Sequence, residues 1–179
     1  MTGRNVDLIE LTPPALRALA AGDLETANLH TSVPLSAYFI RPTMIRVWQR
    51  RAQQILDSPA DLAWITRAVI DTDLGLAVGR AGFHGPADES GMIELGYEID
   101  PELRRRGYAR ASLEWLLDQA RNEPSIHVVR ATISPGNLAS RALVWQYGFV
   151  DVGTQMDDED GLEIIFEVSP DARRTPRAP

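Results

Sequence analysis

The feature that most constrains this chain is a basic loop that joins a strand directly to a helix. Residues 94–109 read E-L-G-Y-E-I-D-P-E-L-R-R-R-G-Y-A. The pattern of Met92–Ile99 predicts a strand, and Pro101 ends it. Beyond the loop, apolar residues recur at the spacing of an amphipathic helix: Leu113, Leu116, Leu117 and Ala120. A strand that leads into a helix in this way leaves backbone N–H groups pointing into the loop, backed by the positive end of the helix dipole.

The composition of the loop suits an anionic group such as a pyrophosphate. Arg104–Arg106 supply positive charge, and Arg110 follows one helical turn later. Gly107 permits close approach of the backbone, and Ala109 is small enough for tight packing. A solvated helix start is the ordinary interpretation of such a charge run. The setting between strand and helix favours phosphate binding instead.

Composition excludes several other classes of protein. The net charge of −7 argues against nucleic acid, because phosphate contacts need a basic face. The absence of cysteine excludes disulfides, thiolate metal sites and a thiol nucleophile, and three histidines without ligand spacing predict no metal. Residues 1–10 do not resemble a signal peptide. No apolar run approaches the ~20 residues of a membrane helix, so we expect a cytoplasmic protein without membrane contact.

The order of predicted elements indicates a mixed α/β domain. The chain of 179 residues is long enough for one core, and we expect one domain over residues 1–168 with a disordered tail over 169–179. Helices are expected after Thr12, after Asp23, over Met44–Leu56, after the basic loop and after Asn137 or Ser134. Residues 33–41 give no clear signal. Strands are expected at Val6–Leu11, Ala63–Ile70, Leu76–Phe83, Met92–Ile99, Val128–Ile133, Phe149–Gln155 and Leu162–Val168.

Two motifs resemble the signatures of the GNAT acetyltransferase superfamily. Arg104-x-x-Gly107-x-Ala109 is similar to the Arg/Gln-x-x-Gly-x-Gly/Ala signature of that family. Asn137-x-x-Ser140, followed by a short helix that ends in Gly148-Phe149, resembles the second signature. The motifs occur in the order of the family, and the resemblance extends over residues 63–168. It is closest to the branch of ribosomal-protein N-terminal acetyltransferases.

The resemblance implies a central, mostly antiparallel sheet of six to seven strands, splayed where acetyl-coenzyme A binds. The strand end near Ile99 is expected to pair with the pantetheine arm, and Asn137 to contact it. The pyrophosphate is expected at the backbone N–H groups of the loop and first helical turn, formed by Arg104, Arg105, Arg106, Gly107, Tyr108, Ala109 and Arg110.

Transfer of an acetyl group to an amine requires the neutral amine. Neutralising a lysine-like amine at pH 7 costs roughly 4–5 kcal/mol, whereas an α-amino group costs only about 1 kcal/mol. A general base is therefore useful, and Glu94 lies at the position of the family's strand glutamate, with a solvated carboxylate as the alternative. Glu98, on the same strand face, is held in reserve. Many family members supply a tyrosine as general acid where this chain has Val144. Ser140 is the candidate to replace it as general acid, and the alternative is that Ser140 is only a helix-face serine bonded to a backbone carbonyl.

The sequence predicts an acetyl-CoA-dependent N-acetyltransferase that works without a covalent enzyme intermediate. Two classes of acceptor remain open: a protein N-terminus, as in the ribosomal branch, or a small amine such as a polyamine, amino sugar or antibiotic, which the acidic composition favours. A non-catalytic acyl-CoA-binding regulatory module is the alternative from a different class. Exposed strand edges make a homodimer plausible.

Overall fold

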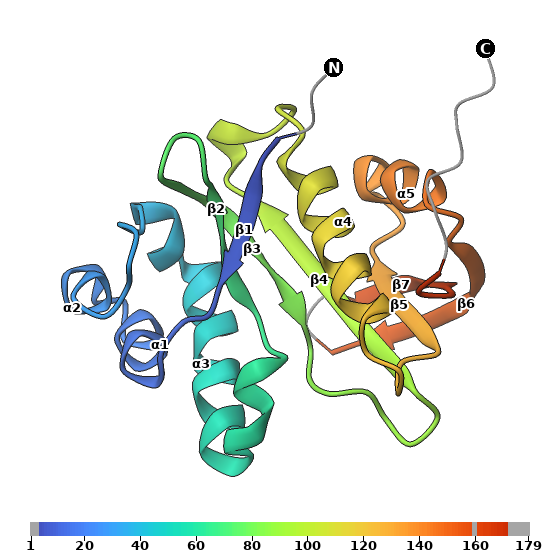
Figure 1. The fold of residues 1–179 in the computed structure, drawn as a ribbon, viewed down its shortest axis with the longest axis horizontal. Helices are drawn as coiled ribbons and strands as arrows, with labels where there is room; N and C mark the ends of the chain where they lie inside the picture. Colours follow the sequence, from blue (N-terminus) through green and yellow to red (C-terminus); the bar gives the residue numbers. More distant parts are fainter. Residues whose placement is uncertain (1–3, 159–160, 172–179) are drawn as a thin grey trace. The chain divides into compact units, whose positions relative to one another are not determined.

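The computed structural model describes residues 4–158 and 161–171 (Figure 1). Seven strands form one sheet in the order β1-β2-β3-β4-β5-β7-β6. The contacts of the chain group into two compact units, one of residues 1–86 with 97–115 and one of residues 87–96 with 116–179. The single domain expected over residues 1–168 stays a prediction.

The first unit contains an antiparallel meander of three strands. β1 (Val6–Ile9) pairs with β2 (Arg67–Asp71), and β2 pairs with β3 (Leu76–Phe83). Among the described residues, three α-helices precede β2 in the chain: α1 (Pro13–Ala20), α2 (Leu24–Asn28) and α3 (Pro42–Asp57). α1 and α2 begin where the sequence predicts, since Thr12 and Asp23 accept backbone N–H bonds as their N-caps. Their apolar faces join a core that includes Leu16, Leu19, Phe39, Met44 and Trp48.

β4 (Met92–Ile99) and α4 (Tyr108–Arg121) carry the strand, loop and helix of the basic motif. Asp100 caps the short 3₁₀-helix η3 (Pro101–Leu103) between them. Gly79 of β3 is needed for close packing beside the end of β4. A Cβ at Gly79 would lie 2.4 Å from the carbonyl oxygen of Glu98, well inside contact distance. The glycine therefore fixes how near the backbone of β3 lies to the strand end that leads into the loop.

The second unit contains β5 (Val128–Ile133), α5 (Leu138–Trp145), β6 (Val150–Asp157) and β7 (Gly161–Val168). β4 and β5 are parallel, with Met92–Glu94 opposite Val128–Arg130. β5 pairs with β7, and β7 with β6, in antiparallel registers. The mixed, mostly antiparallel sheet predicted from the sequence is confirmed, whereas the splay at a ligand site stays a prediction.

Several predicted boundaries were wrong. β2 begins at Arg67 rather than Ala63, because Pro59–Ala63 form a 3₁₀-helix (η2) that starts at a proline. The segment without a clear signal contains another 3₁₀-helix, η1 (Ala37–Ile40), whose Tyr38 and Phe39 are buried. Most of the predicted tail, residues 172–179, lies outside the described residues.

The two edge strands of the sheet are β1 and β6. The homodimer predicted from exposed strand edges stays a prediction. Within residues 4–158 and 161–171, no helix is both long and apolar enough to cross a membrane.

Candidate functional site

The basic loop has an unusual backbone. Arg105 has a φ of 62° and Gly107 a φ of 94°, both in the left-handed region. Among described residues other than glycine, Arg105 alone has a positive φ. A non-glycine residue in this region costs roughly 1–2 kcal/mol, so the surrounding structure must hold it there. A backbone that alternates between right-handed and left-handed conformations can form a concave arrangement of N–H groups that binds anions.

The loop ends at the first turn of α4. The carbonyl of Gly107 accepts the first helical bond, from the N–H of Ala111 at 3.1 Å. The N–H groups that begin this helix have no acceptor within it, and the helix dipole makes the region positive. Gly107 is exposed, while Ala109 and Arg110 are half-buried in the first turn. The loop thus places exposed arginines before the first turn of α4, and the anion site expected there stays a prediction.

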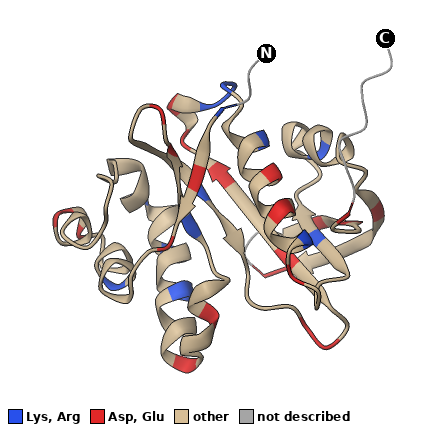
Figure 2. Ribbon diagram, in the orientation of Figure 1, with Lys and Arg blue, Asp and Glu red and all other residues tan. Residues whose placement is uncertain are grey.

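The three arginines of the loop do not play equal parts. The Nε of Arg104 donates to the carbonyl of Ile99 at 3.0 Å, and its Nη2 lies 3.7 Å from a carboxylate oxygen of Glu98. Arg106 donates through Nη2 to the carbonyl of Glu102 at 3.3 Å. Arg104 thus ties the loop to the end of β4. Arg105 and Arg106 are exposed, and the loop forms the blue segment before α4 in Figure 2.

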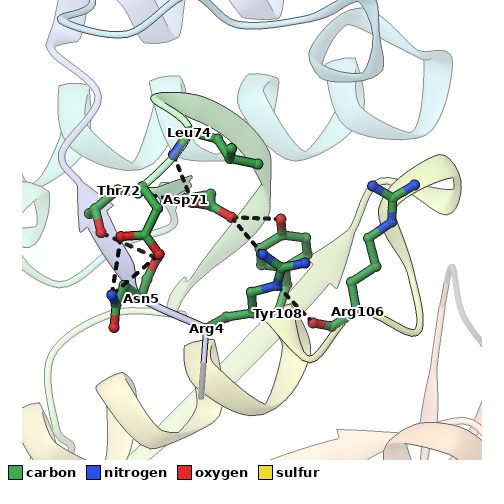
Figure 3. A network of polar contacts seen from close by, with 8 residues as sticks. Arg4, Asn5, Asp71, Thr72, Leu74, Arg106 and Tyr108 are labelled. Atoms are coloured by element: carbon green, nitrogen blue, oxygen red, sulfur yellow. Dashed lines mark hydrogen bonds and ion pairs between the residues drawn. The ribbon is translucent and has the colours of Figure 1, made fainter. Parts of the chain in front are cut away.

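The side chain of Tyr108 points into the protein, so the predicted phosphate contact of this residue, through its backbone N–H group, stays a prediction. It is 2% exposed, and its hydroxyl donates to Asp71 at 2.7 Å (Figure 3). Burial and the bond to Asp71 raise the pKa of Tyr108. A contact of this residue with a phosphate would therefore have to come from its backbone N–H group.

Asp71 is a carboxylate with 0% exposure at the end of β2. Besides the hydroxyl of Tyr108, it accepts from the backbone N–H groups of Asp73 and Leu74, each at 3.0 Å, and lies 3.8 Å from Nη1 of Arg4. Burial alone would raise the pKa of Asp71, but the bonds from Tyr108, Leu74 and Asp73 and the charge of Arg4 outweigh it and lower the pKa.

The carboxylate proposed as base, Glu94, lies in the second unit on β4. It is half-buried, and its Oε1 accepts from the hydroxyl of Thr132 on β5 at 2.6 Å. A hydrogen bond of this kind fixes the orientation of the carboxylate. The reserve candidate, Glu98, instead lies 3.2 Å from Arg80 and 3.7 Å from Arg104, which gives it a structural role.

The second motif forms the start of α5. The side-chain oxygen of Asn137 accepts from the backbone N–H of Ser140 at 3.1 Å, so Asn137 is the N-cap, one of the two caps that the sequence predicts. The oxygen can accept a second hydrogen bond, so the cap does not prevent the expected contact of Asn137 with pantetheine, which stays a prediction. Ser140 is half-buried. Val144 is fully buried, so the family's tyrosine position faces the core here.

The predicted site residues are divided between the two compact units. Ile99 and the loop residues share the first unit, while Glu94, Asn137 and Ser140 share the second. Sequence reasoning missed Arg4, Asp71 and Thr132, which contact the predicted residues through long-range pairings. Period-two alternation could have suggested Thr132, but nothing in the sequence marks the other two. Among the described residues, no cluster of acidic and histidine side chains could hold a metal ion.

Comparison with known protein families identifies the family of this chain. The pattern of the acetyltransferase (GNAT) domain matches residues 15–150, well over half of the chain. This chain belongs to the GNAT acetyltransferase family. The Bacillus subtilis protein YjdG, described as an uncharacterised N-acetyltransferase, is 31% identical over 88 residues, which are 49% of this chain and 51% of YjdG. The chain thus spans about half the length of the curated relatives that it matches.

Solved structures share the GNAT fold along nearly the whole chain. The ribosomal-protein-S5-alanine acetyltransferase of Vibrio fischeri has a TM-score of 0.63 at 18% identity, covering 98% of this chain and 97% of its own. The spermidine/spermine N-acetyltransferase SpeG of Vibrio cholerae has a TM-score of 0.63 at 17% identity, covering 92% of each chain. YncA of Salmonella typhimurium, solved with its cofactor acetyl-CoA, has a TM-score of 0.56 at 19% identity and covers 99% of each. These identities establish the fold alone.

Proposed function

We propose that this chain is an N-acetyltransferase that binds acetyl-CoA at the Arg104–Gly107 loop and transfers the acetyl group directly to an amine. The observation that carries the proposal is the left-handed backbone of Arg105 and Gly107 at the start of α4. Membership of the GNAT family supports the same chemistry. The backbone donors and exposed arginines would hold the pyrophosphate of the cosubstrate.

Glu94 is proposed as the general base. Its carboxylate would accept a proton from the ammonium form of the acceptor, directly or through one water, which frees the lone pair that attacks the thioester. The bond from Thr132 fixes the orientation of the carboxylate on β4. As the tetrahedral intermediate collapses, the C–S bond breaks, and the second proton that the acceptor nitrogen loses in becoming an amide goes to the leaving thiolate. Ser140 is proposed to relay it, donating its own hydroxyl proton to the thiolate and taking up the one from nitrogen, with water as the alternative.

For the acceptor, we propose a protein N-terminus, in line with the branch that the motifs resemble. The structural likeness to a ribosomal-protein-S5-alanine acetyltransferase supports that choice. An α-amino group is also the acceptor that demands least of a base, since its neutral form costs only about 1 kcal/mol at pH 7. A small polyamine is the second candidate, supported by the net charge of −7 and by the likeness to a spermidine/spermine N-acetyltransferase.

A comparison of wild type with Glu94→Gln tests the proposal against a non-catalytic acyl-CoA-binding module. We expect the variant to bind CoA as wild type does and to lose about 10²–10⁴-fold in kcat at neutral pH, because general base catalysis contributes that much. Glu89→Gln is the matched control, since Glu89 is an exposed carboxylate in the loop before β4. Equal turnover of wild type and Glu94→Gln from pH 6 to 9 would refute the role of Glu94.

A further inference from the structure

Arg4 lies beside the phosphate loop, although more than ninety residues separate them in sequence. It precedes β1, and its Nε donates to the carbonyl oxygen of Arg106 at 3.2 Å. Its guanidinium also lies 5.2 Å from the centre of the Tyr108 ring and 3.8 Å from the carboxylate of Asp71. Figure 3 shows these contacts converging on one side chain.

The bond from Arg4 fixes the peptide unit between Arg106 and Gly107. This peptide is trans, as all described peptides are, so the carbonyl of Arg106 and the N–H of Gly107 point in opposite directions. Holding the carbonyl on the side of Arg4 therefore turns the N–H of Gly107 to the opposite side. Gly107 also lies near Arg4, because a Cβ built on it would lie 3.6 Å from Cγ of Arg4.

Asp71, the carboxylate next to Arg4, is held in place by several hydrogen bonds. Asp71 is fully buried and is held by two backbone N–H groups and by the hydroxyl of Tyr108. Tyr108 is itself the first residue of α4. Arg4 thus connects the end of β2, the first turn of α4 and the left-handed part of the loop. The carboxylate orients the guanidinium, and the guanidinium orients the peptide.

We propose that Arg4 is a positioning residue that aims the N–H of Gly107 at the pyrophosphate of acetyl-CoA. This inference rests on the proposed function of the loop. Arg4 acts through the Arg106–Gly107 peptide and need not contact the ligand. Its removal frees that peptide to rotate, so the loop must be ordered again each time the ligand binds.

The test is the affinity of the full chain for CoA, measured by titration calorimetry for wild type, Arg4→Met and Arg17→Met. Methionine keeps the length of the side chain and removes the donor and the charge. Arg17 is exposed on α1 and provides the matched control for the loss of one positive charge. We expect Arg4→Met to weaken CoA binding about two- to twelvefold, the effect of losing one hydrogen bond, and Arg17→Met to leave it unchanged.

Three further measurements separate positioning from simple charge attraction and from general destabilisation. The ratio of dissociation constants should persist in about 0.5 M salt, which screens charge attraction but leaves a peptide orientation intact. With S-acetylpantetheine, which lacks phosphates, Arg4→Met and wild type should give equal KM. The kcat of Arg4→Met at saturating acetyl-CoA should stay within about twofold of wild type.

Equal CoA affinity of Arg4→Met and wild type would overturn the proposal. The proposal would also be overturned if the ratio of the two dissociation constants for CoA fell to one in high salt, or if Arg4→Met raised the KM for S-acetylpantetheine as much as it weakened CoA binding. Arg4→Gln, which retains a neutral donor, provides a second variant if Arg4→Met does not fold. Wild type that binds no CoA at all would instead refute the proposed function, so the two failures are distinguishable.

Discussion

The bond between Tyr108 and Asp71 offers the sharpest test of how the phosphate loop is supported. Tyr108→Phe removes a hydroxyl that donates at 2.7 Å to a carboxylate with no exposure to water. A hydrogen bond to a charged group contributes about 1.5–3 kcal/mol, and the carboxylate left behind cannot regain it from solvent. For a chain of this size each kcal/mol shifts the melting temperature by about 2–4 °C. We therefore expect a loss of about 3–12 °C at pH 7.

Tyr38→Phe is the matched control for that substitution. Tyr38 is equally buried, but its hydroxyl donates at 3.3 Å to the neutral backbone carbonyl of Glu98. Such a bond contributes about 0.5–1.5 kcal/mol, so its loss should lower the melting temperature by about 1–6 °C. Thermal unfolding followed by circular dichroism measures both. Equal shifts for the two variants would contradict the claim that Tyr108 stabilises a buried charge.

The dependence on pH gives a second readout of the same bond. The folded-state pKa of Asp71 is lowered from 3.8, so its stabilising contribution is present above pH 4 and is lost as the pH falls through the folded value. Below that point the carboxyl group is neutral, and the difference between wild type and Tyr108→Phe should shrink. A difference that stays constant from pH 7 to below the folded-state pKa of Asp71 would show that the carboxylate charge plays no part.

Two other predictions concern the loop and the base. Gly107→Ala places a Cβ on a residue with a φ of 94°, so the strain falls on the binding loop. We expect the KM for acetyl-CoA to rise about fivefold or more with little change in kcat. An unchanged KM would contradict this prediction. Thr132→Val removes the hydroxyl that donates to Glu94, a bond that favours the anionic carboxylate in wild type. We expect kcat to be about two- to twelvefold lower and the acidic limb of the pH–rate profile to move to higher pH. A profile that does not move would argue that Thr132 has no influence on Glu94.

The order of strands and helices could be predicted because the apolar periodicity and the caps agree. Thr12, Asp23 and Asn137 cap helices as expected, and β3, β4 and β5 have the predicted bounds. The error at β2 has a physical cause: Trp64 and Ile65 are apolar enough to read as strand, but the proline before them starts a 3₁₀-helix. Local pattern cannot show which of two local structures the tertiary contacts favour.

The candidate site could be predicted only where a motif lies in one stretch of sequence. Gly107 has a left-handed backbone, which glycine adopts readily, but the same conformation at Arg105 has no signal in its residue type. The burial of Tyr108 depends on Asp71, and the orientation of the Arg106 carbonyl depends on Arg4. These partners come from β2 and from the segment before β1, so their contacts arise only once the first unit has folded.

The most direct test of acetyl transfer is the release of CoA thiol from acetyl-CoA against a panel of amines, with mass spectrometry of the products. The panel spans peptides with free N-termini, polyamines and aminoglycosides. The chain has no lysine, so acetylation of its own side-chain amines cannot imitate turnover. We predict thiol release that depends on the added amine, fastest with an N-terminal peptide, and an amide-linked acetyl group on that amine. Thiol release that is the same with and without every amine, while CoA still binds, would contradict direct transfer and favour the acyl-CoA-binding module.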